Sequence, residues 1–259
     1  MSGRAALLPP HTKDAFLGGR VTLLQPQKGH RAGLDAALLQ ALVPEDASGL
    51  LVDIGTGVGT VAFSAAARAT ALTAVALERD AGLLTLAAEA LRLPENAGFA
   101  SRVHLLQADA GDTGAVREAL ADAGAADWVL MNPPFDSPGR GRGSPDPGRL
   151  SAHMGDADLL QAWCRTAATL LRPGGRLGII HRAEALAEVL EALPGPFGGI
   201  RILPAHPAEG AAATRVLVRA ELASRAPLSI LPGLVLHRPG GAWTDEADAV
   251  LRGQAALAL

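Results

Sequence analysis

From residue 50 to residue 222, short apolar runs alternate with longer segments in which apolar residues recur at helical spacing. The apolar runs are strand candidates and cover 50–55, 72–78, 102–109, 127–132, 176–181, 200–205 and 214–222. Helical segments separate the first five runs, over 58–69, 80–92, 112–123 and 157–171. Near-continuous apolar strands joined by helices are typical of a mostly parallel sheet with both faces covered. The pattern therefore predicts an α/β fold.

The last two apolar runs differ from the others in how they are joined. Only about eight residues separate position 205 from position 214, which is too few for a helical crossover between parallel strands. We therefore expect the final strand to run antiparallel to its neighbour.

The two ends of the chain lie outside this alternation. Residues 1–48 begin with a basic, glycine-containing segment, followed by a helical pattern that ends at Pro44. We expect this helix to pack on the core formed by residues 49–222. Residues 223–259 carry two short apolar runs broken by Pro and Gly, and then a short amphipathic helix. They are predicted to be an appendage without a core of their own.

A glycine-rich loop, "DIGTGVG", joins the first strand candidate to the first helix. Its residues Gly55, Gly57 and Gly59 allow a tight turn and a close approach of the backbone to a ligand. The spacing is G-x-G-x-G and differs from the dinucleotide fingerprint G-x-G-x-x-G. Asp53, two residues before the first glycine, disfavours a pyrophosphate and favours a cationic ligand. Taken alone, the loop is also compatible with an ordinary strand-to-helix turn.

Two further acids end the next two strand candidates. Glu78 lies 23 residues after Gly55, where a carboxylate can accept hydrogen bonds from both hydroxyls of a ribose. Asp109, beside Ala110, can meet the amino group of an adenine. Each acid is also a candidate helix N-cap. Because ligands bind at the carboxyl ends of strands in open α/β sheets, three acids in this order indicate an adenosine-bearing ligand with a positive, non-phosphate end.

The fourth strand candidate ends in "DWVLMNPPFDSP". Two consecutive prolines, Pro133 and Pro134, lack backbone N–H groups and restrict the residues before them to extended backbone. Asn132 precedes them and the aromatic Phe135 follows. Asn-Pro is also a common way to begin a turn, so a strand-ending turn is the structural alternative.

The order "DIGTGVG … ALE … QAD … MNPPF" resembles the class I methyltransferases that use S-adenosylmethionine and carry an Asn-Pro-Pro-aromatic motif. Together with "HRAGLDAALLQA" and "ATRVLVRA", it is most similar to the bacterial tRNA (adenine-N6) methyltransferases that modify a valine tRNA beside the anticodon. The resemblance spans roughly residues 13–222. It implies a Rossmann-like, seven-stranded sheet with helices on both faces and an antiparallel last strand.

The resemblance also implies a cofactor, S-adenosyl-L-methionine, and the residues that hold it. The expected cofactor-binding residues are Asp35, Asp53, Gly55, Thr56, Gly57, Gly59, Glu78, Arg79, Asp109, Ala110 and Asn132. The expected catalytic residues are Asn132, Pro133, Pro134 and Phe135. The Asn132 side-chain oxygen and the Pro133 carbonyl would accept the two N–H groups of an exocyclic amine, and Phe135 would stack on the base.

Composition limits how an RNA substrate can be bound. The chain of 259 residues has a formal net charge of -3 and a pI of about 6.2, so the molecule as a whole is not a basic nucleic-acid coat. RNA, most simply tRNA, has to meet local basic patches. The candidates are Lys28 and Arg31 before the first helix, and Arg140, Arg142 and Arg149 in a predicted loop over 137–153. A solvated loop is the alternative for the second group.

Other compositional features exclude several classes of protein. Cys164, the single cysteine, lies in a helical apolar pattern, so we expect a buried structural thiol and no internal disulfide. The sequence indicates no metal requirement and no apolar run of 18 or more residues, so we expect a cytoplasmic protein without a membrane span. The oligomeric state, monomer or homodimer, is left open.

Three other functions remain compatible with the motifs. Guanine amino groups in rRNA and glutamine amides in proteins also present a planar NH2 group to an Asn-Pro-Pro-aromatic corner. A degenerate module that binds the cofactor without catalysis is the third alternative.

Overall fold

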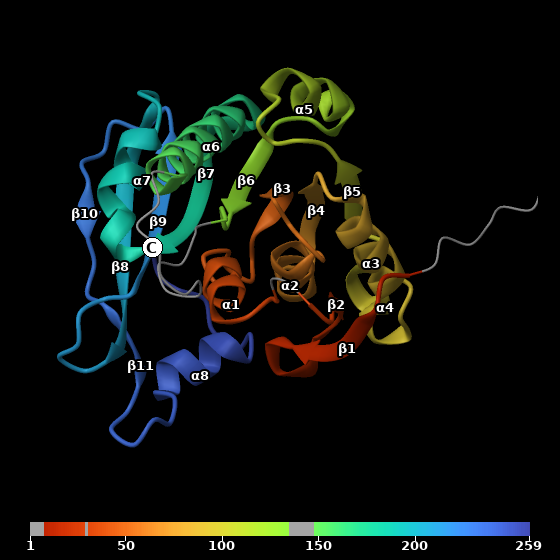
Figure 1. The fold of residues 1–259 in the computed structure, drawn as a ribbon, viewed down its shortest axis with the longest axis horizontal. Coiled ribbons are helices and arrows are strands. Elements are labelled where there is room, and N and C mark those ends of the chain that lie inside the picture. The colour runs from red at the N-terminus through yellow and green to blue at the C-terminus, as the bar shows by residue number, and fades with distance from the viewer. Residues whose placement is uncertain (1–7, 29–30, 135–147) are drawn as a thin grey trace, which may run out of the picture.

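The computed structural model describes residues 8–28, 31–134 and 148–259, with residues 148–157 described by their backbone only. Its centre is a mostly parallel sheet (Figure 1). The seven predicted strands are all present and follow the spatial order β8-β9-β7-β6-β3-β4-β5. In chain order they are β3 (Ser48–Ile54), β4 (Ala71–Glu78), β5 (Val103–Gln107), β6 (Ala126–Met131), β7 (Leu171–Arg182), β8 (Phe197–Ala208) and β9 (Arg215–Leu222). The predicted α/β class is confirmed.

The antiparallel last strand is also confirmed, because β9 runs antiparallel to both β7 and β8. The prediction of seven strands was too low for this sheet. Two short strands, β10 (Ser229–Ile230) and β11 (Leu234–His237), pair in parallel with β8 and make nine. They cover the outer edge of β8, whose backbone groups would otherwise face solvent.

Helices cover both faces of the sheet, as the continuous apolar strands require. One face packs against α1 (Leu34–Gln40), α2 (Thr60–Arg68) and α3 (Ala81–Leu91). The other packs against α5 (Thr113–Ala119), α6 (Gly148–Leu170) and α7 (Leu186–Ala192). Because side chains alternate along a strand, Leu51 joins the first layer and its neighbour Val52 joins the second.

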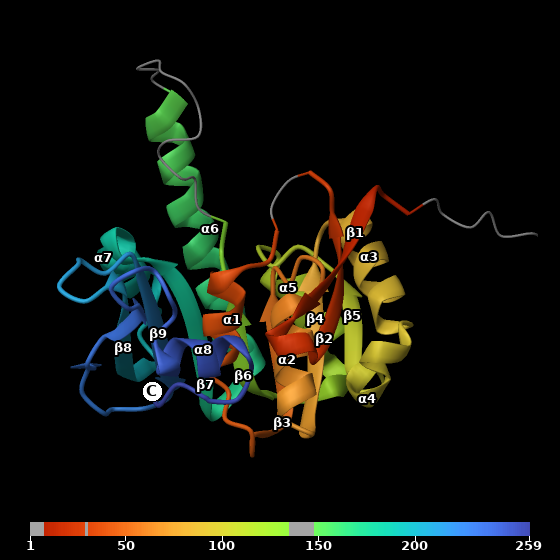
Figure 2. The ribbon, with the colours of Figure 1, turned by 90° about the horizontal axis from the view of Figure 1, so that it is seen from below.

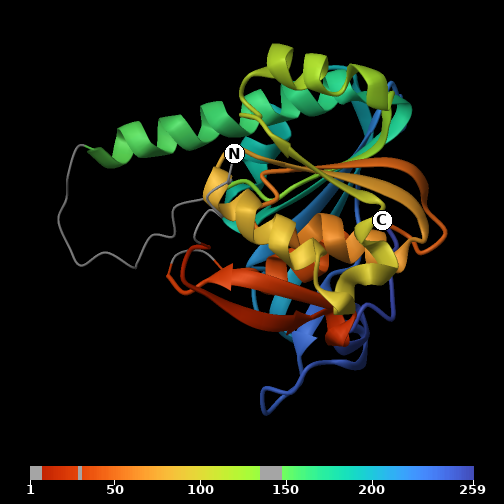
Figure 3. The ribbon, with the colours of Figure 1, turned by 90° about the vertical axis from the view of Figure 1, so that its right-hand side faces the viewer.

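Most helix boundaries lie within a few residues of the prediction, but α6 is an exception. It begins at Gly148, whereas the helix was predicted from residue 157 and residues 137–153 were predicted to be a loop. The N-terminal part of α6 extends away from the body of the molecule (Figures 2 and 3). Two helices, α4 (Ala97–Ala100) and α7, were not predicted.

An antiparallel hairpin, β1 (His11–Phe16) with β2 (Val21–Pro26), precedes the sheet and was not predicted. It lies beside α3 (Figure 3). Its strand β2 is buried, and a buried Asn96 holds it in place. Asn96 Oδ1 accepts from the Thr22 N–H at 2.9 Å, and Asn96 Nδ2 donates to the Thr22 carbonyl at 2.8 Å. The N-terminal region therefore shares the core of the sheet.

The C-terminal residues also pack on this core. Thr244 caps α8 (Asp245–Leu251), which contacts β11 and α1. Beyond α8, Leu257 and Leu259 are buried, and the Leu257 N–H donates to the Ala41 carbonyl at 2.7 Å. In the part of the chain that the structure describes, no helix is long and apolar enough to cross a membrane.

Candidate functional site

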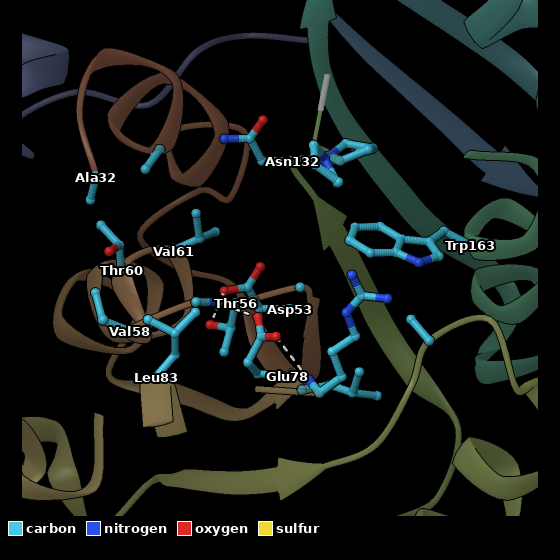
Figure 4. Close-up of a pocket in the computed structure, with 18 of the residues that line it drawn as sticks. Ala32, Asp53, Thr56, Val58, Thr60, Val61, Glu78, Leu83, Asn132 and Trp163 are labelled. Carbon is cyan, nitrogen blue, oxygen red and sulfur yellow. Dashed lines mark hydrogen bonds between the residues drawn. The ribbon is translucent and has the colours of Figure 1, made fainter. Parts of the chain in front are cut away.

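A cavity of about 500 Å³ opens at the carboxyl ends of β3, β4 and β6 (Figure 4). This volume lies within the range of small-molecule sites, and the position is the one where open α/β sheets bind ligands. Twelve residues predicted from the sequence line it: Asp35, Asp53, Gly55, Thr56, Gly57, Glu78, Arg79, Asp109, Ala110, Asn132, Pro133 and Pro134.

The glycine loop connects β3 to α2, and each of its glycines has a positive φ: 70° at Gly55, 59° at Gly57 and 91° at Gly59. The Gly55 and Thr56 N–H groups donate to the Leu77 carbonyl at 2.9 and 3.0 Å, which ties the loop to β4. A Cβ on Gly57 would meet no atom within 4 Å. At this position the backbone is open to the cavity, as a closely approaching ligand requires.

The other two glycines serve packing within the protein. A Cβ on Gly55 would lie 2.3 Å from Cη2 of Trp163, and one on Gly59 would lie 2.4 Å from Cε1 of Phe63. Gly59 was expected to contact the cofactor, but it is not among the residues that line the cavity. Its role in the structure is to let the loop fold against Phe63.

Asp53 lies at the cavity wall, but its carboxylate is hydrogen-bonded within the protein. Its side chain accepts from Thr56 Oγ1 at 2.5 Å and from the Ala62 N–H at 3.1 Å, and the residue is 2% exposed. Burial raises the pKa of this carboxyl group from 3.8 to about 7, although both hydrogen bonds act in the opposite direction. We expected Asp53 to face a cationic ligand. In the structure its hydrogen bonds hold the loop against α2, and its contact with the cofactor stays a prediction.

Glu78, at the end of β4, is held by the backbone. Its Oε2 accepts from the Gly57 N–H at 3.0 Å, and its Oε1 accepts from the Arg79 and Asp80 N–H groups at 2.9 and 3.0 Å. An ionised carboxylate has about four lone-pair positions, so these three donors use most of them. The carboxylate is thereby fixed beside Gly57 at the cavity, in the place expected of a ribose acceptor.

Asp109 follows β5 by two residues, so it lies in the loop and does not end the strand as predicted. Its side chain is 55% exposed and accepts from the Gly111 N–H at 2.8 Å. Arg79 Nη1 lies 3.9 Å from Asp109 Oδ2. The neighbouring Ala110 is buried, and its carbonyl accepts from Thr166 Oγ1 of α6 at 2.7 Å.

Asn132, Pro133 and Pro134 follow directly after β6, which lies between β3 and β7. Asn132 is half-buried, Pro133 is buried and Pro134 is exposed. In Figure 4, Asn132 lies on the opposite side of the cavity from Glu78, with Asp53 and Thr56 between them. The Asn132 amide makes no hydrogen bond to another described residue. Phe135 lies outside the described residues.

Among the lining residues that sequence reasoning missed, Trp163 and Arg215 have the most specific contacts. Trp163, on α6, is 8% exposed and lies against Gly55. Arg215, the first residue of β9, donates from Nε to both carboxylate oxygens of Asp35, at 2.9 and 3.0 Å. "ATRVLVRA" contained Arg215, but nothing near it in the sequence points to a partner 180 residues away.

The structure describes only part of the predicted RNA contacts. Lys28 is exposed. Arg31 donates to Asp14 at 2.7 Å and to Thr12 at 3.0 Å, so the hairpin holds its side chain. Arg140 and Arg142 lie outside the described residues, and Arg149 lies in α6 among the residues described by backbone only.

Two described residues outside the cavity, Cys164 and His181, have shifted pKa values because they are buried. The Cys164 side chain is fully buried, as predicted, and burial raises the pKa of its thiol to about 12. Burial lowers the pKa of His181. Across residues 8–28, 31–134 and 158–259, no group of three or more His, Cys, Asp or Glu side chains is placed to hold a metal ion.

The residues present fit S-adenosylmethionine. Gly57 leaves its backbone open to the cavity, Glu78 is fixed beside it, and the cavity is large enough for a nucleoside with a side chain. Apart from the buried Asp53, the described lining has three acids and two cations, Arg79 and Arg215, which suits a ligand of net positive charge better than a pyrophosphate. This site on this sheet is that of a class I S-adenosylmethionine-dependent methyltransferase.

Comparison with known proteins agrees with the fold and the site. The family model "Methyltransferase small domain" matches residues 31–144. A tRNA1(Val) (adenine(37)-N6)-methyltransferase from Shewanella amazonensis is 32% identical over 194 residues, which are 73% of this chain and 77% of that protein. The chain therefore belongs to the methyltransferase small domain family.

Two solved structures are also similar. A predicted O-methyltransferase from Agrobacterium tumefaciens is 32% identical, with a TM-score of 0.73, over 87% of this chain and 99% of that chain. TrmN from Thermus thermophilus is 25% identical, with a TM-score of 0.51, over 78% of this chain and 56% of that chain. The fold extends over almost the whole length of the first structure.

Proposed function

We propose that this methyltransferase modifies the exocyclic N6 amino group of an adenine in tRNA, near the anticodon. The observation that carries the proposal is the placement of Asn132 and Pro133 at the end of β6, in the wall of the same cavity as Glu78. The Shewanella relative, whose name states this activity, supports the choice of acceptor.

The chemistry of an aromatic amine explains the residues at this corner. The lone pair of an adenine amino group is delocalised into the ring, so the nitrogen is a weak nucleophile. If Asn132 Oδ1 and the Pro133 carbonyl accept its two N–H groups, the lone pair can localise on the nitrogen and point towards the donor. S-adenosylmethionine supplies an electrophilic methyl group on its sulfonium. The contribution of the protein is alignment and fixed dipoles.

The prolines make this arrangement stiff. Each proline fixes its own φ, and Pro134 restricts the backbone of Pro133 to extended conformations. The Pro133 carbonyl therefore has a defined direction relative to Asn132. Phe135, next in the chain, is the residue that we propose stacks on the base.

The resemblance to a predicted O-methyltransferase does not favour a hydroxyl acceptor. A hydroxyl group needs a general base during attack. Three of the four acids at the cavity already have close partners: Asp53 is hydrogen-bonded to Thr56, Asp35 is ion-paired with Arg215, and Glu78 accepts from three backbone N–H groups. Two neutral oxygen acceptors at Asn132 and Pro133 match an NH2 group better.

Substrate RNA has to reach the cavity at the carboxyl ends of the parallel strands. Lys28 and Arg31 precede α1, whose residues Asp35 and Ala36 line the cavity, so a phosphate contact there would place a nucleotide near the site. Arg140, Arg142 and Arg149 remain predicted phosphate contacts.

The test is incubation of the purified protein with radiolabelled S-adenosylmethionine and a mixture of tRNA, rRNA and protein from a strain that lacks the gene. Nucleoside mass spectrometry of the product should identify N6-methyladenosine, and digestion of separated tRNAs should place it in one species. Label in N2-methylguanosine of rRNA, or in protein, would contradict the proposed acceptor and support one of the alternatives. Binding of the cofactor without transfer to any of them would support a non-catalytic module.

A further inference from the structure

We propose that Asp35 and Arg215 bind the amino-acid end of S-adenosylmethionine, with Arg215 receiving the α-carboxylate and Asp35 the α-ammonium group. The inference depends on the cofactor and not on the identity of the RNA. It gives a role to an ion pair that joins α1 to β9 at the wall of the cavity.

The positions of the charged residues along the cavity support this assignment. Glu78 ends β4 and Asp109 follows β5, at the carboxyl ends of the parallel strands, and they are suited to the ribose and adenine. Asn132 follows β6, nearer the centre of the sheet. Arg215 begins β9, on the far side of β7 from Asn132. If the adenosine of the cofactor lies beside Glu78 and its sulfur beside Asn132, its amino-acid end lies beside Asp35 and Arg215.

The location of Arg215 follows from the antiparallel strand. Because β9 runs opposite to β7, its first residue lies beside Arg182, the last residue of β7, at the carboxyl ends of the parallel strands. Asp35 lies in the first turn of α1, which packs on β6 and β7. In a strand parallel to β7, the first residue would lie at the other end of the strands, far from the cavity.

The charges of the cavity wall lead to the same residue. A carboxylate needs a cation or several N–H donors once it leaves water. Of the described residues that line the cavity, only Arg79 and Arg215 are cationic, and Arg79 is next to Glu78 at the adenosine end. Arg215 is therefore the cation suited to the carboxylate at the other end.

The pair is also matched to a zwitterion. Arg215 Nε donates to both oxygens of Asp35, and the two side chains are 28% and 19% exposed, so the pair is partly shielded from water. A planar guanidinium has five N–H donors and matches a carboxylate with two of them. A neutral ion pair that meets an amino acid's carboxylate and ammonium groups gives alternating charges, and no net charge is buried.

The test measures binding of three ligands by isothermal titration calorimetry, without RNA. S-adenosylhomocysteine carries the complete amino-acid end, its decarboxylated analogue lacks the carboxylate, and 5′-methylthioadenosine lacks the amino-acid end altogether. Arg215→Met should weaken S-adenosylhomocysteine by about 10- to 100-fold, the range of one charge-assisted hydrogen bond. The affinities for the other two ligands should stay within about twofold of those of the unsubstituted protein.

Asp35→Asn should lower the affinity for both ligands that carry the ammonium group and leave the affinity for 5′-methylthioadenosine unchanged. Arg215→Lys keeps the charge without the planar fork, so it should weaken S-adenosylhomocysteine to an intermediate degree. Arg172→Met is the matched control, because Arg172 pairs with Asp127 at 2.6 Å outside this cavity. It should leave all three affinities unchanged.

Two outcomes overturn the proposal. If all Asp35 and Arg215 variants that fold bind S-adenosylhomocysteine normally, the pair only joins α1 to β9 or contacts the methyl acceptor. If they weaken S-adenosylhomocysteine and 5′-methylthioadenosine equally, the effect is a general loss of the cavity. Because the adenosine-only ligand reports an intact site, selective loss cannot come from unfolding. Failure to methylate tRNA would refute the proposed acceptor and would not alter these affinities.

Discussion

The two sides of the cavity are held in opposite ways. On the glycine-loop side, Asp53 and Glu78 accept five hydrogen bonds from Thr56 and from backbone N–H groups of the same chain. On the β6 side, the Asn132 amide makes no hydrogen bond to another described residue. The difference indicates that one side is built before any ligand arrives, whereas the other keeps its acceptors for a substrate. Substitutions should therefore affect folding and binding on the first side, and chemistry on the second.

The largest effect should come from Asn132→Ala. We expect the rate of methyl transfer to fall by about 10²- to 10³-fold or more, because one fixed acceptor of the reacting amine is removed. The affinity for S-adenosylhomocysteine and the melting temperature should change little, since the amide has no internal partner. Single-turnover kinetics and calorimetry measure the two quantities separately. A large loss of stability would contradict the contrast between the two sides.

On the glycine-loop side, Gly55→Ala should destabilise the fold by about 2–4 kcal/mol. The new methyl group would lie 2.3 Å from Trp163 Cη2, and φ is +70°. Gly57→Ala is the matched control, because its φ is +59° but no atom lies within 4 Å; we expect about 1 kcal/mol. Urea denaturation measures both. Adding Trp163→Leu should recover part of the loss in Gly55→Ala and none in Gly57→Ala.

Asp53 gives the loop side a pH dependence. Because its pKa is raised from 3.8 to about 7 in the folded protein, the folded state binds more protons than the unfolded state between these values. The stability from this group is therefore complete below about pH 4 and is lost as pH rises to about 7, by up to about 4 kcal/mol.

Asp53→Asn should remove this slope. At pH 8 the variant should be more stable than the unsubstituted protein by about 1–2 kcal/mol, less than the full amount because the amide NH2 is a buried donor. Denaturation curves at pH 5, 6, 7 and 8 would measure it. The same slope in both proteins would show that Asp53 ionises freely in the folded state.

The smallest effect should come from Arg172→Met, outside both sides of the cavity. Arg172 is 52% exposed and pairs with Asp127. Such surface pairs contribute at most about 1 kcal/mol and less at high salt. Thermal melts at low and high ionic strength measure the change. A loss of several kcal/mol, or a loss of methyl transfer, would extend the functional region beyond the cavity.

Much of the site could be predicted because its residues are close together in the sequence and lie at strand ends. Gly57, Glu78 and Asn132 each lie at or just after the end of a strand that its apolar run identifies, and parallel strands bring their carboxyl ends to one edge of the sheet. The direction of a side chain could not be predicted in this way. Asp53 has the expected position, but its oxygens turn to Thr56 and the Ala62 N–H, because the helix after the loop offers donors there.

The N-terminal hairpin was missed for a different reason. The strand "HTKDAF" of β1 has no apolar alternation that marks a buried face, and its residues are only intermediate or exposed. Pairing with the buried strand β2 makes it a strand. Such pairing depends on a partner and on the cover that α3 provides, so a single-segment pattern does not predict it.

The sequence by itself determined the α/β class, the strand order along the chain, the antiparallel last strand and the residues at the strand ends. These follow from local periodicity, connection length and turn chemistry. Only the tertiary structure decided that Trp163 lies against Gly55 and that Arg215 meets Asp35 across 180 residues. The physical reason is that contacts between distant segments depend on how helices and strands pack, and packing has no period that can be read along the chain.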